Sequence, residues 1–299
     1  MDRNTTHISV CVCTYKRRKH LTILLNGLQD QDTNGLFAYS VVVVDNDCTK
    51  SAKRTVEDLR RHSSVSISYF NEPEQNIALA RNKAVANAKG ELIALIDDDE
   101  VPSRKWLINL YKACDEFHAD GVLGPVVPYY EMTLPPKWVV RGKFYERPSH
   151  RTGEVLDWTN TRTSNVILRR EIFDNGENLF RREFGSGGED RDFFRRMIAK
   201  SFRFVWCAEA PVYEAVTAVR CTRSFMLRRA LLRGQLPHFT TVDYAKSLVA
   251  VPLYTAFLPL LFVAGHHLFM KHLIKDFEHI GRLLHLCGIN LIKQKYVVE

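Results

Sequence analysis

Short apolar runs rich in β-branched residues recur through the first hundred positions of the chain. They cover residues 8–15, 39–47 and 91–100, and each ends in polar or acidic side chains. A further run at 64–70 alternates apolar with polar residues. Such runs are typical of β-strands, and the near-continuous ones are typical of strands that are covered on both faces of a sheet.

Segments with helical spacing separate these strands. Between the first two strands, one helical stripe carries Leu21, Leu24, Leu25 and Leu28. Residues 76–89 predict a tightly packed helix with Gly90 as its C-cap, and residues 102–117 predict another helix. The alternation of strand and helix predicts an α/β fold with a doubly wound, mostly parallel sheet.

The strand ends are the predicted site, because ligands of a doubly wound sheet bind beyond the C-terminal ends of its strands. The sequence places polar or acidic residues at these ends, namely Thr14, Asp45, Asp97, Asp98, Asp99 and Glu100. Adjacent carboxylates repel one another and need a cation, and oxygen ligands favour Mg²⁺ or Mn²⁺ over zinc. A solvated acidic turn is the alternative for this run taken alone. No glycine-rich phosphate loop follows the first strand, which argues against a dehydrogenase or a P-loop enzyme.

The segment 124–163 is rich in proline, arginine and aromatic residues, which indicates an irregular and functional insertion. Its residues Trp138 and Trp158 suit stacking on a sugar ring, although packing in the core is the commoner role of tryptophan. Residues 163–170 then return to the pattern of a strand. The insertion therefore precedes one more strand of the predicted sheet.

A glycine-rich turn and a helix follow at 184–194, and the helix opens with Glu189 and Asp190. Acids in the first turn of a helix are favoured by its dipole, so simple capping is one explanation. The preceding glycines, Gly187 and Gly188, allow the backbone to approach another group closely. They favour a binding or catalytic site over capping alone.

Composition bounds the class of protein and its partners. The chain has 299 residues, of which 45% are hydrophobic, which suits one large globular domain or somewhat more. A net charge of +8 favours anionic partners such as phosphates or lipid headgroups. Nucleic-acid binding is suggested by the charge alone, because the sequence contains no recognisable nucleic-acid-binding module. Seven cysteines, mostly within apolar segments, and an N-terminus without an apolar signal core predict a reduced, cytosolic protein.

The last third of the chain is first basic and then hydrophobic. Residues 215–242 contain arginines but no acid, which indicates a surface for phosphate or anionic lipid, or else a solvated basic face. Residues 249–264 are apolar but short for a membrane span, and Pro252 and Pro259 interrupt them, so they favour a re-entrant or interfacial insertion. We therefore expect a catalytic domain at 1–245, with halves at 1–123 and 124–245, and a membrane-associating helical tail at 246–299.

Five stretches together resemble the family 2 inverting glycosyltransferases, enzymes with the GT-A fold that use nucleotide-sugar donors. They are CTYKR at 13–17, VVVVDN at 41–46, NIALARNKA at 76–84, IDDDE at 96–100 and GGEDRDFFRR at 187–196. They span about two thirds of the chain, and their order and spacing carry the likeness. With the stretches EPEQNIALARN and WCAEAPVYE and the hydrophobic tail, the pattern looks most like the bacterial succinoglycan-type glucosyltransferases of exopolysaccharide assembly.

The resemblance implies roles for individual residues. Those expected around the nucleotide-sugar are Thr14, Tyr15, Arg17, Asp45, Arg81, Asp97 and Asp98, with Asp45 accepting a hydrogen bond from uracil. Asp99 is the implied metal ligand, and Glu214 stands near the position where many relatives carry a metal-binding histidine. Asp190 is the implied general base with Glu189 beside it. The residues expected to bind the acceptor are Trp158, Asn165, Gly188, Arg228 and Arg229.

The implied reaction moves a hexose, with glucose favoured, from a UDP-sugar to a saccharide on polyprenyl diphosphate. It requires Mg²⁺ or Mn²⁺ and takes place at the cytoplasmic face of the bacterial inner membrane. Transfer to polyprenyl phosphate itself is one alternative. Two others are a metal-dependent nucleotidyltransferase, which would leave the loop before Asp190 without a task, and a catalytically silent nucleotide-sugar-binding subunit.

Overall fold

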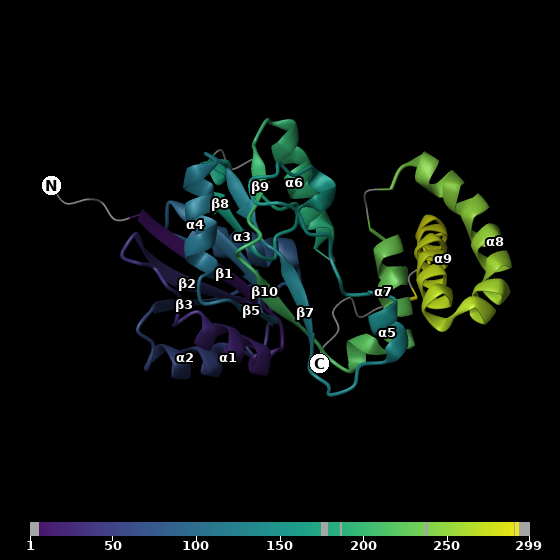
Figure 1. Ribbon diagram of the computed structural model, residues 1–299, viewed down its shortest axis with the longest axis horizontal. Coiled ribbons are helices and arrows are strands. Elements are labelled where there is room, and N and C mark those ends of the chain that lie inside the picture. Colours follow the sequence, from purple (N-terminus) through teal and green to yellow (C-terminus); the bar gives the residue numbers. More distant parts are fainter. Residues whose placement is uncertain (1–5, 175–178, 186, 237–238, 290, 293–299) are drawn as a thin grey trace. The chain divides into compact units, whose positions relative to one another are not determined.

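The computed structural model describes residues 6–174, 179–185, 187–236, 239–289 and 291–292 (Figure 1). The chain forms two compact units. The first contains residues up to 127 together with 147–214, and the second contains 128–146 together with residues from 215 onward. These boundaries differ from the sequence-based division at 245, because the segment 128–146 and the basic stretch after 214 pack with the C-terminal helices.

A seven-stranded sheet in the order β3-β2-β1-β4-β8-β6-β9 forms the centre of the first unit. Its strands are β1 (Thr6–Thr14), β2 (Phe37–Asp45), β3 (Ser66–Asn71), β4 (Leu92–Asp97), β6 (Gly121–Leu123), β8 (Val166–Arg169) and β9 (Phe204–Trp206). Strands β1 to β4 are parallel to one another, whereas β8 pairs antiparallel with both β4 and β6. The predicted α/β fold with a mostly parallel sheet is confirmed.

Helices cover both faces of this sheet (Figure 1). One face carries α1 (Arg18–Gly27), α2 (Lys53–Arg60) and α4 (Trp106–Glu116), and the other carries α3 (Ile77–Asn87) and α6 (Glu189–Ala199). Side chains of β1 alternate accordingly, with Val10 and Val12 in the first core and Cys11 in the second. Apolar burial on both faces, at roughly 25 cal/mol per Å², holds the strand ends in fixed positions.

A three-stranded sheet, in the order β5-β10-β7, lies beyond the acidic end of β4. Its strands are β5 (Glu100–Pro102), β7 (Val126–Tyr130) and β10 (Val212–Val216). Because Pro102 ends β5, the helix expected from residue 102 begins only at Trp106. Short 3₁₀ helices complete the described elements of the chain, namely η1 (Trp158–Asn160), η2 (Arg170–Phe173), η3 (Arg182–Phe184) and η4 (Val219–Cys221).

Gly90 has a different role from the predicted one. The helix α3 ends at Asn87 with Ala88 as its C-cap, so Gly90 does not cap it. A Cβ at Gly90 would lie 2.5 Å from the carbonyl oxygen of His7 and would clash with the backbone of β1. The residue is therefore glycine because β1 and the start of β4 approach each other too closely for a side chain.

The described part of the second unit contains the helices α5 (Lys137–Arg141), α7 (Arg223–Gly234), α8 (Thr241–Ala264) and α9 (His266–Leu286). Helices α7 and α9 are in close contact at two glycines. A Cβ at Gly234 would lie 2.3 Å from the carbonyl oxygen of Glu278, and one at Gly281 would lie 2.4 Å from that of Leu231. Helices α8 and α9 form a hairpin that turns at Gly265, whose φ of 152° suits glycine.

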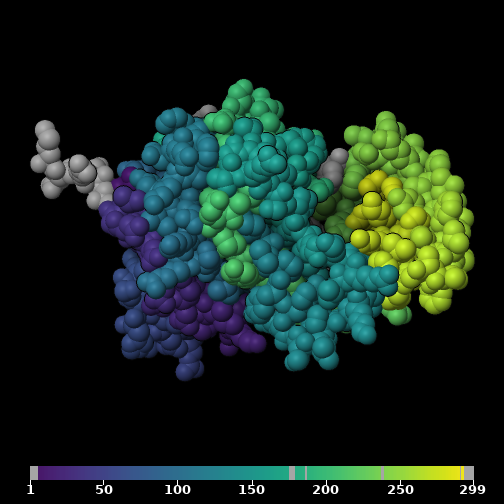
Figure 2. Space-filling view, viewed as in Figure 1, coloured from purple at the N-terminus to yellow at the C-terminus, as the bar shows by residue number. Residues whose placement is uncertain are grey.

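Helix α8 is longer than the sequence predicted. It is one continuous helix of 24 residues that passes through Pro252 and Pro259 and begins before residue 249. At 1.5 Å per residue its length is about 36 Å, enough for the hydrocarbon core of a bilayer. Among the described residues it is the one helix whose length and composition suit a membrane span, and 6% of its most apolar window is buried. The expectation that this segment is too short is wrong, and its surface is visible in yellow-green in Figure 2.

Candidate active site

The ends of β1 and β4 bring four of the predicted residues together. Asp98 accepts hydrogen bonds from the Thr14 hydroxyl at 2.7 Å and from the Arg17 guanidinium at 3.0 Å. The same nitrogen of Arg17 lies 3.1 Å from a carboxylate oxygen of Asp99. Burial raises the pKa of Asp98 to about 6 although Arg17 opposes this, and Asp99 adds to the rise. Since β1 and β4 are parallel and adjacent, their polar ends lie at one edge of the sheet.

Asp45 ends β2 and is fully buried. Its Oδ1 accepts a hydrogen bond from the backbone N–H of Asp47 at 3.1 Å. Its Oδ2 accepts from the backbone N–H of Ala52 at 2.7 Å and from the Tyr69 hydroxyl at 3.0 Å. Burial raises the pKa of Asp45, and these donors oppose the rise. The carboxylate thus shapes the loop after β2, and its contact with a base stays a prediction, as does that of the half-buried Tyr15.

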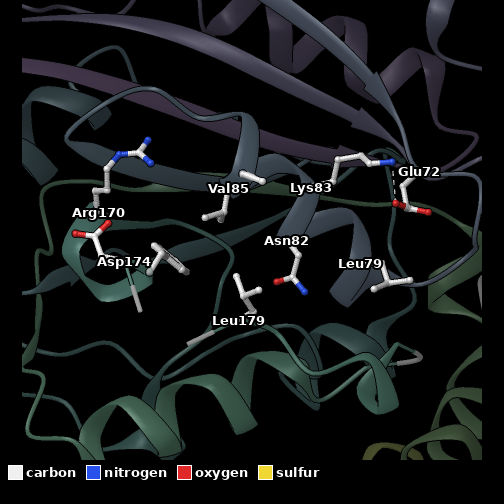
Figure 3. A pocket seen from close by; sticks show the side chains of 10 residues that line it. Glu72, Leu79, Asn82, Lys83, Val85, Arg170, Asp174 and Leu179 are labelled. Carbon is white, nitrogen blue, oxygen red and sulfur yellow. Dashed lines mark ion pairs between the residues drawn. The ribbon is translucent and has the colours of Figure 1, made fainter. Parts of the chain in front are cut away.

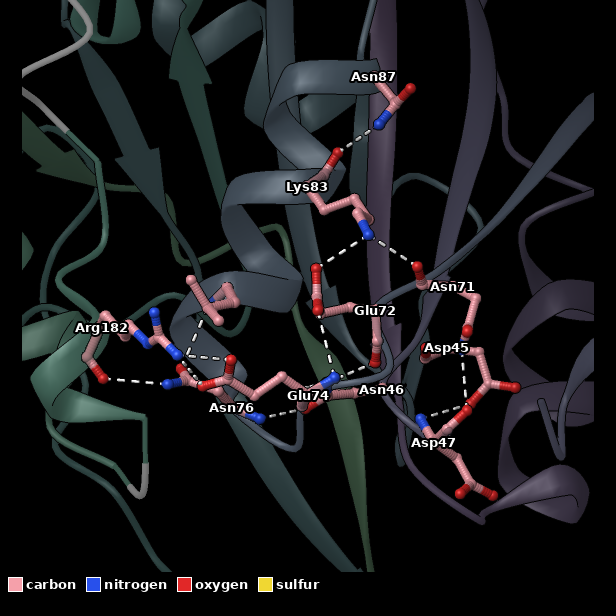
Figure 4. A network of polar contacts seen from close by, with 11 residues as sticks. Asp45, Asn46, Asp47, Asn71, Glu72, Glu74, Asn76, Lys83, Asn87 and Arg182 are labelled. Carbon is pink, nitrogen blue, oxygen red and sulfur yellow. Dashed lines mark hydrogen bonds and ion pairs between the residues drawn. The ribbon is translucent and has the colours of Figure 1, made fainter. Parts of the chain in front are cut away.

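A polar network ties this loop to the start of α3 and to the segment before α6 (Figure 4). The side-chain amide of Asn46 donates to the carbonyl oxygens of Glu72 and Glu74, and its oxygen accepts the backbone N–H of Asn76 at 2.9 Å. Asn76 caps α3 and also donates to the carbonyl oxygen of Arg182 at 3.0 Å, across 106 positions of sequence. The network therefore anchors the approach to α6 at the end of β2.

Arg81 connects the acidic end of β4 to the first turn of α6. This residue of α3 is 8% exposed, and its guanidinium donates to Asp97 at 3.2 Å and to Glu189 in a short contact. The other carboxylate oxygen of Glu189 is buried without a hydrogen-bond partner. The next residue, Asp190, is half-exposed, and its Oδ1 accepts the backbone N–H of Arg191 at 2.7 Å. Glu189 thus fixes the helix start, and Asp190 beside it is partly exposed to solvent.

A second group of charges lies next to the first. Glu100 is 1% exposed, and its Oε2 accepts the backbone N–H of Asp97 at 3.0 Å while its Oε1 has no hydrogen-bond partner. In the small sheet it lies opposite Glu214, which pairs with Arg147 at 2.5 Å. Burial, Asp97 and Glu214 raise the pKa of Glu100 well above its ordinary value. Two carboxylates facing each other here indicate a site that accommodates positive charge.

The acids of this region fit a divalent cation that brings phosphate ligands with it. Within the described ranges, no three His, Cys, Asp or Glu side chains form a ready metal site. Three guanidinium groups, of Arg17, Arg81 and Arg147, bond to the acids of the cluster. Those acids are Asp97, Asp98, Asp99, Glu189 and Glu214, and Glu100 adds an unpartnered buried oxygen. Since Mg²⁺ is usually held by one or two carboxylates plus phosphates, the donor set suits such an ion.

The predicted acceptor residues differ in their availability. Asn165 is fully buried, and its Oδ1 accepts the indole N–H of Trp106 at 2.7 Å. Its amide donates to the carbonyl oxygens of Pro125 and Ala210, both at 2.8 Å. The prediction that Asn165 binds the acceptor is therefore wrong, because its polar groups hold the fold together. Trp158 lies in η1, which packs on α6, and is 39% exposed.

Gly188 is the N-cap of α6 with a φ of 87°, a left-handed conformation that favours glycine. Arg228 and Arg229 lie on α7, in the second unit, and their contact with an acceptor stays a prediction. Trp138 packs edge-on against Phe144 at 5.3 Å between ring centroids, in the core of the second unit. Of the two tryptophans considered for sugar stacking, Trp158 is the exposed one.

Sequence reasoning missed two arginines near these acids. Arg147 bonds Glu214, as described above. Arg162 is half-buried, and Glu100, Asp190 and Glu214 act on its charge. Both arginines fall in the segment 124–163, whose richness in arginine was the available signal. The partner of Arg147 could not be assigned because Glu214 comes from a separate strand, β10.

A cavity of about 460 Å³ lies between α3 and η2 (Figure 3). Its apolar lining includes Leu79, Val85 and Phe173, and at its edge Lys83 pairs with Glu72 at 2.9 Å. It contains none of the predicted site residues. The acidic strand ends, and not this cavity, are therefore the candidate active site.

The sequence comparisons give related proteins. The sequence model of glycosyl transferase family 2 matches residues 9–176. The chain is 35% identical over 237 residues to the succinoglycan biosynthesis protein ExoM of Rhizobium meliloti (strain 1021), covering 79% of this chain and 75% of ExoM. It is 32% identical over 115 residues to the poly(ribitol-phosphate) beta-N-acetylglucosaminyltransferase TarS of Staphylococcus aureus (strain Mu50 / ATCC 700699), covering 38% of this chain and 20% of TarS.

Solved structures share the fold. Crystal structures of S. aureus TarS 1–349 in complex with UDP and with UDP-GlcNAc both superpose with a TM-score of 0.53. Their sequence identities are 20% and 17%, and each superposition covers 96% of this chain and 93% of the TarS chain. At these identities the likeness shows the common GT-A architecture.

Proposed function

Since this chain belongs to glycosyl transferase family 2, we propose that it is an inverting enzyme that moves a hexose from a UDP-sugar to a saccharide on polyprenyl diphosphate. Family membership makes it a glycosyltransferase, and the proposal concerns the donor, the acceptor and the stereochemistry. The name of ExoM supports surface or exopolysaccharide biosynthesis as the process, with glucose as the first sugar to test. The UDP and UDP-GlcNAc complexes of TarS support a UDP-sugar donor.

One observation carries the proposal, namely the bridge that Arg81 makes between Asp97 and Glu189. These acids come from the end of β4 and the start of α6, and Asp190 follows directly. A donor held at the strand ends would therefore present its sugar toward the carboxylate of Asp190. The acids at the end of β4 would then act on the leaving diphosphate, and Asp190 would act on the attacking hydroxyl of the same displacement.

Asp190 is the proposed general base. Inverting transfer is one displacement at the anomeric carbon, so the proton of the acceptor hydroxyl must pass to a nearby base. The side chain of Asp190 is half-exposed, and its negative charge is favoured at the N-terminus of α6. Glu189, which is buried against Arg81, positions this turn and is not itself open to a substrate.

The residues at the strand ends are the proposed donor site. Thr14 and Arg17 hold the carboxylate of Asp98, and Arg17 also bonds Asp99, which is the proposed ligand of Mg²⁺ or Mn²⁺. A bound cation would neutralise charge that develops on the leaving diphosphate. Glu214, whose Oε2 bonds Arg147, is the proposed second ligand.

The second unit is the proposed membrane-binding part. Helix α8 exposes large apolar side chains along its length, including Leu253, Phe257 and Leu260. Arginines of α7, among them the exposed Arg229, would face anionic headgroups or the diphosphate of the acceptor. These features support action at the cytoplasmic face of a bacterial inner membrane, where polyprenyl-linked acceptors would be available.

The test is UDP release from UDP-glucose and other UDP-hexoses in the presence of Mn²⁺, with and without a polyprenyl-diphosphate-linked saccharide. We expect release that depends on the acceptor, stops with EDTA and returns with Mg²⁺ or Mn²⁺. Absence of transfer with every donor would contradict the proposal. Efficient transfer to polyprenyl phosphate alone would show that polyprenyl phosphate, and not a lipid-linked saccharide, is the acceptor. Release of pyrophosphate would indicate a nucleotidyltransferase.

A further inference from the structure

Arg162 differs from the other arginines near the candidate active site. Arg17, Arg81 and Arg147 each donate to a carboxylate. Arg162 makes neither a hydrogen bond nor a salt bridge within the part of the chain that the structure describes. Burial and the neighbouring Arg147 lower the pKa of Arg162 to about 10. A guanidinium partly withdrawn from water is normally paired, so an anion is the partner that Arg162 would take.

A second arginine lies beside it. Arg147 donates to Glu214 at 2.5 Å and to the Ser164 hydroxyl at 3.5 Å, and Ser164 follows Arg162 closely on the same loop. Two guanidinium groups close together repel each other. The neighbouring acids Glu100, Asp190 and Glu214 act on the charge of Arg162, but none of them forms a salt bridge with it within the described residues. An anion at Arg162 would remove the remaining repulsion. The two guanidinium groups together therefore suit a bound anion.

We propose that Arg162, supported by Arg147, binds the β-phosphate of the nucleoside diphosphate donor and of the UDP that the reaction releases. The inference rests on the proposed function and adds a residue that the family resemblance did not point to. The β-phosphate is the group bonded to the anomeric carbon, which must lie near Asp190. Asp190 and the two acids of the small sheet, Glu100 and Glu214, all act on the charge of Arg162.

The role in the reaction follows from the bonds that change. The acceptor oxygen forms a bond to the anomeric carbon and loses its proton to Asp190. The bond from the anomeric carbon to the β-phosphate oxygen breaks, and its electron pair stays on the phosphate. Arg162 would stabilise this charge through a planar, charge-assisted contact, for which arginine suits phosphate better than lysine does.

The test compares UDP with UMP, which lacks the β-phosphate. Calorimetric titrations with Mn²⁺ would use the full-length wild-type protein and the variants Arg162→Met and Arg162→Lys. The matched control is Arg151→Met, at an exposed arginine of the same loop. We expect Arg162→Met to bind UDP about 10- to 100-fold more weakly, as for loss of a hydrogen bond between charged groups. Its affinity for UMP should be unchanged, Arg162→Lys should be intermediate, and Arg151→Met should match the wild type.

Several results would overturn the inference. If Arg162→Met binds UDP and UMP equally more weakly than the wild type, Arg162 does not bind the β-phosphate. Unchanged UDP affinity with a raised KM for the lipid-linked acceptor would place the anion on the acceptor instead. If thermal unfolding shows that Arg162→Met is not folded, Arg162→Lys decides, and it must weaken UDP more than UMP. A wild-type protein that fails to bind UDP would contradict the proposed function and not this residue in particular.

Discussion

The two units place polar and apolar side chains in opposite ways. The first unit buries aliphatic residues on both faces of its sheet and gathers carboxylates at the strand ends, where arginines from distant segments bond them. The hairpin of α8 and α9 buries Ser247 and Asp276 and exposes large apolar residues such as Leu260, at 65%, and Phe262, at 63%. The first arrangement suits water, and the second suits apolar surroundings.

The difference also separates the tasks of the polar residues. In the first unit they lie where a donor and an acceptor would meet. In the hairpin they join the helices, since the Ser247 hydroxyl lies 3.0 Å from Nδ1 of His279 and the Thr255 hydroxyl donates to Asp276 at 3.1 Å. Polar contacts between helices are the expected means of holding a helix pair within lipid. Under the proposed function, the chemistry would belong to the first unit and membrane attachment to the hairpin.

The largest expected effect comes from removing the proposed base. Asp190→Asn should lower the turnover of sugar transfer by about 10²- to 10⁴-fold, the usual contribution of a general base. Affinity for UDP should change little, because the strand ends that bind the donor are intact. The control is Asp115→Asn, on the exposed side of α4, which should keep full turnover. Near-normal turnover of Asp190→Asn would mean that another group takes the proton.

Removing the bridge between the two acidic elements should cost stability as well as activity. Arg81→Met leaves the buried carboxylate of Glu189 without its cation, which should lower the free energy of unfolding by about 3–5 kcal/mol. Urea denaturation measures this. Arg54→Met, at a guanidinium that is 95% exposed, should change stability by less than about 0.5 kcal/mol. Similar losses in the two variants would refute the bridge as a structural element.

Introducing a charge on the apolar surface of the hairpin should weaken membrane binding. Leu260→Lys places a charge on the exposed apolar side of α8 and should weaken membrane insertion by roughly 2.5–3.5 kcal/mol. Thr241→Lys, at the exposed start of the same helix, is the control and should leave binding unchanged. Flotation with vesicles that contain anionic lipid reports both. Equal flotation of the two variants, or a wild-type protein soluble at low salt without detergent, would argue against insertion.

The smallest predicted effect concerns Asp45. Tyr69→Phe removes one donor to its carboxylate and should lower the free energy of unfolding by about 1–2 kcal/mol at pH 7. The folded-state pKa of Asp45 is raised above its ordinary value, so the stability due to its protonation is present below that ordinary value and is lost as pH rises through the folded pKa. Tyr69→Phe should raise this pKa further. Urea denaturation should therefore show a difference from wild type that shrinks as the pH falls, and a constant difference would contradict this account.

The sequence predicted the parallel part of the fold because local pattern determines it. Apolar runs that end at Thr14, Asp45 and Asp97 define β1, β2 and β4, and adjacency of parallel strands then places their ends at one edge. The helix predicted at 76–89 follows from its small apolar residues, and the structure has it as α3, Ile77–Asn87, with Asn76 as N-cap. These features need no knowledge of contacts between distant segments.

The remaining features depend on such contacts. Asn165 has a polar side chain of the kind that binds ligands. Its hydrogen bonds are all made within the protein, however, to Trp106 and to two carbonyl groups from separate loops. Arg147 pairs with Glu214 across 67 positions of sequence, and no local pattern marks the two as partners. Helix α8 exceeds its apolar run because a capping box formed by Thr240 and Asp243 starts it earlier.

The most direct test of the account is a crystal structure of the protein with Mn²⁺ and an unreactive UDP-sugar analogue. The account predicts an anomalous Mn²⁺ signal beside Asp99, with the diphosphate on the ion and the anomeric carbon facing the carboxylate of Asp190. An ion bound away from Asp99, or a sugar whose anomeric carbon lies out of reach of an acceptor hydroxyl bonded to Asp190, would contradict it.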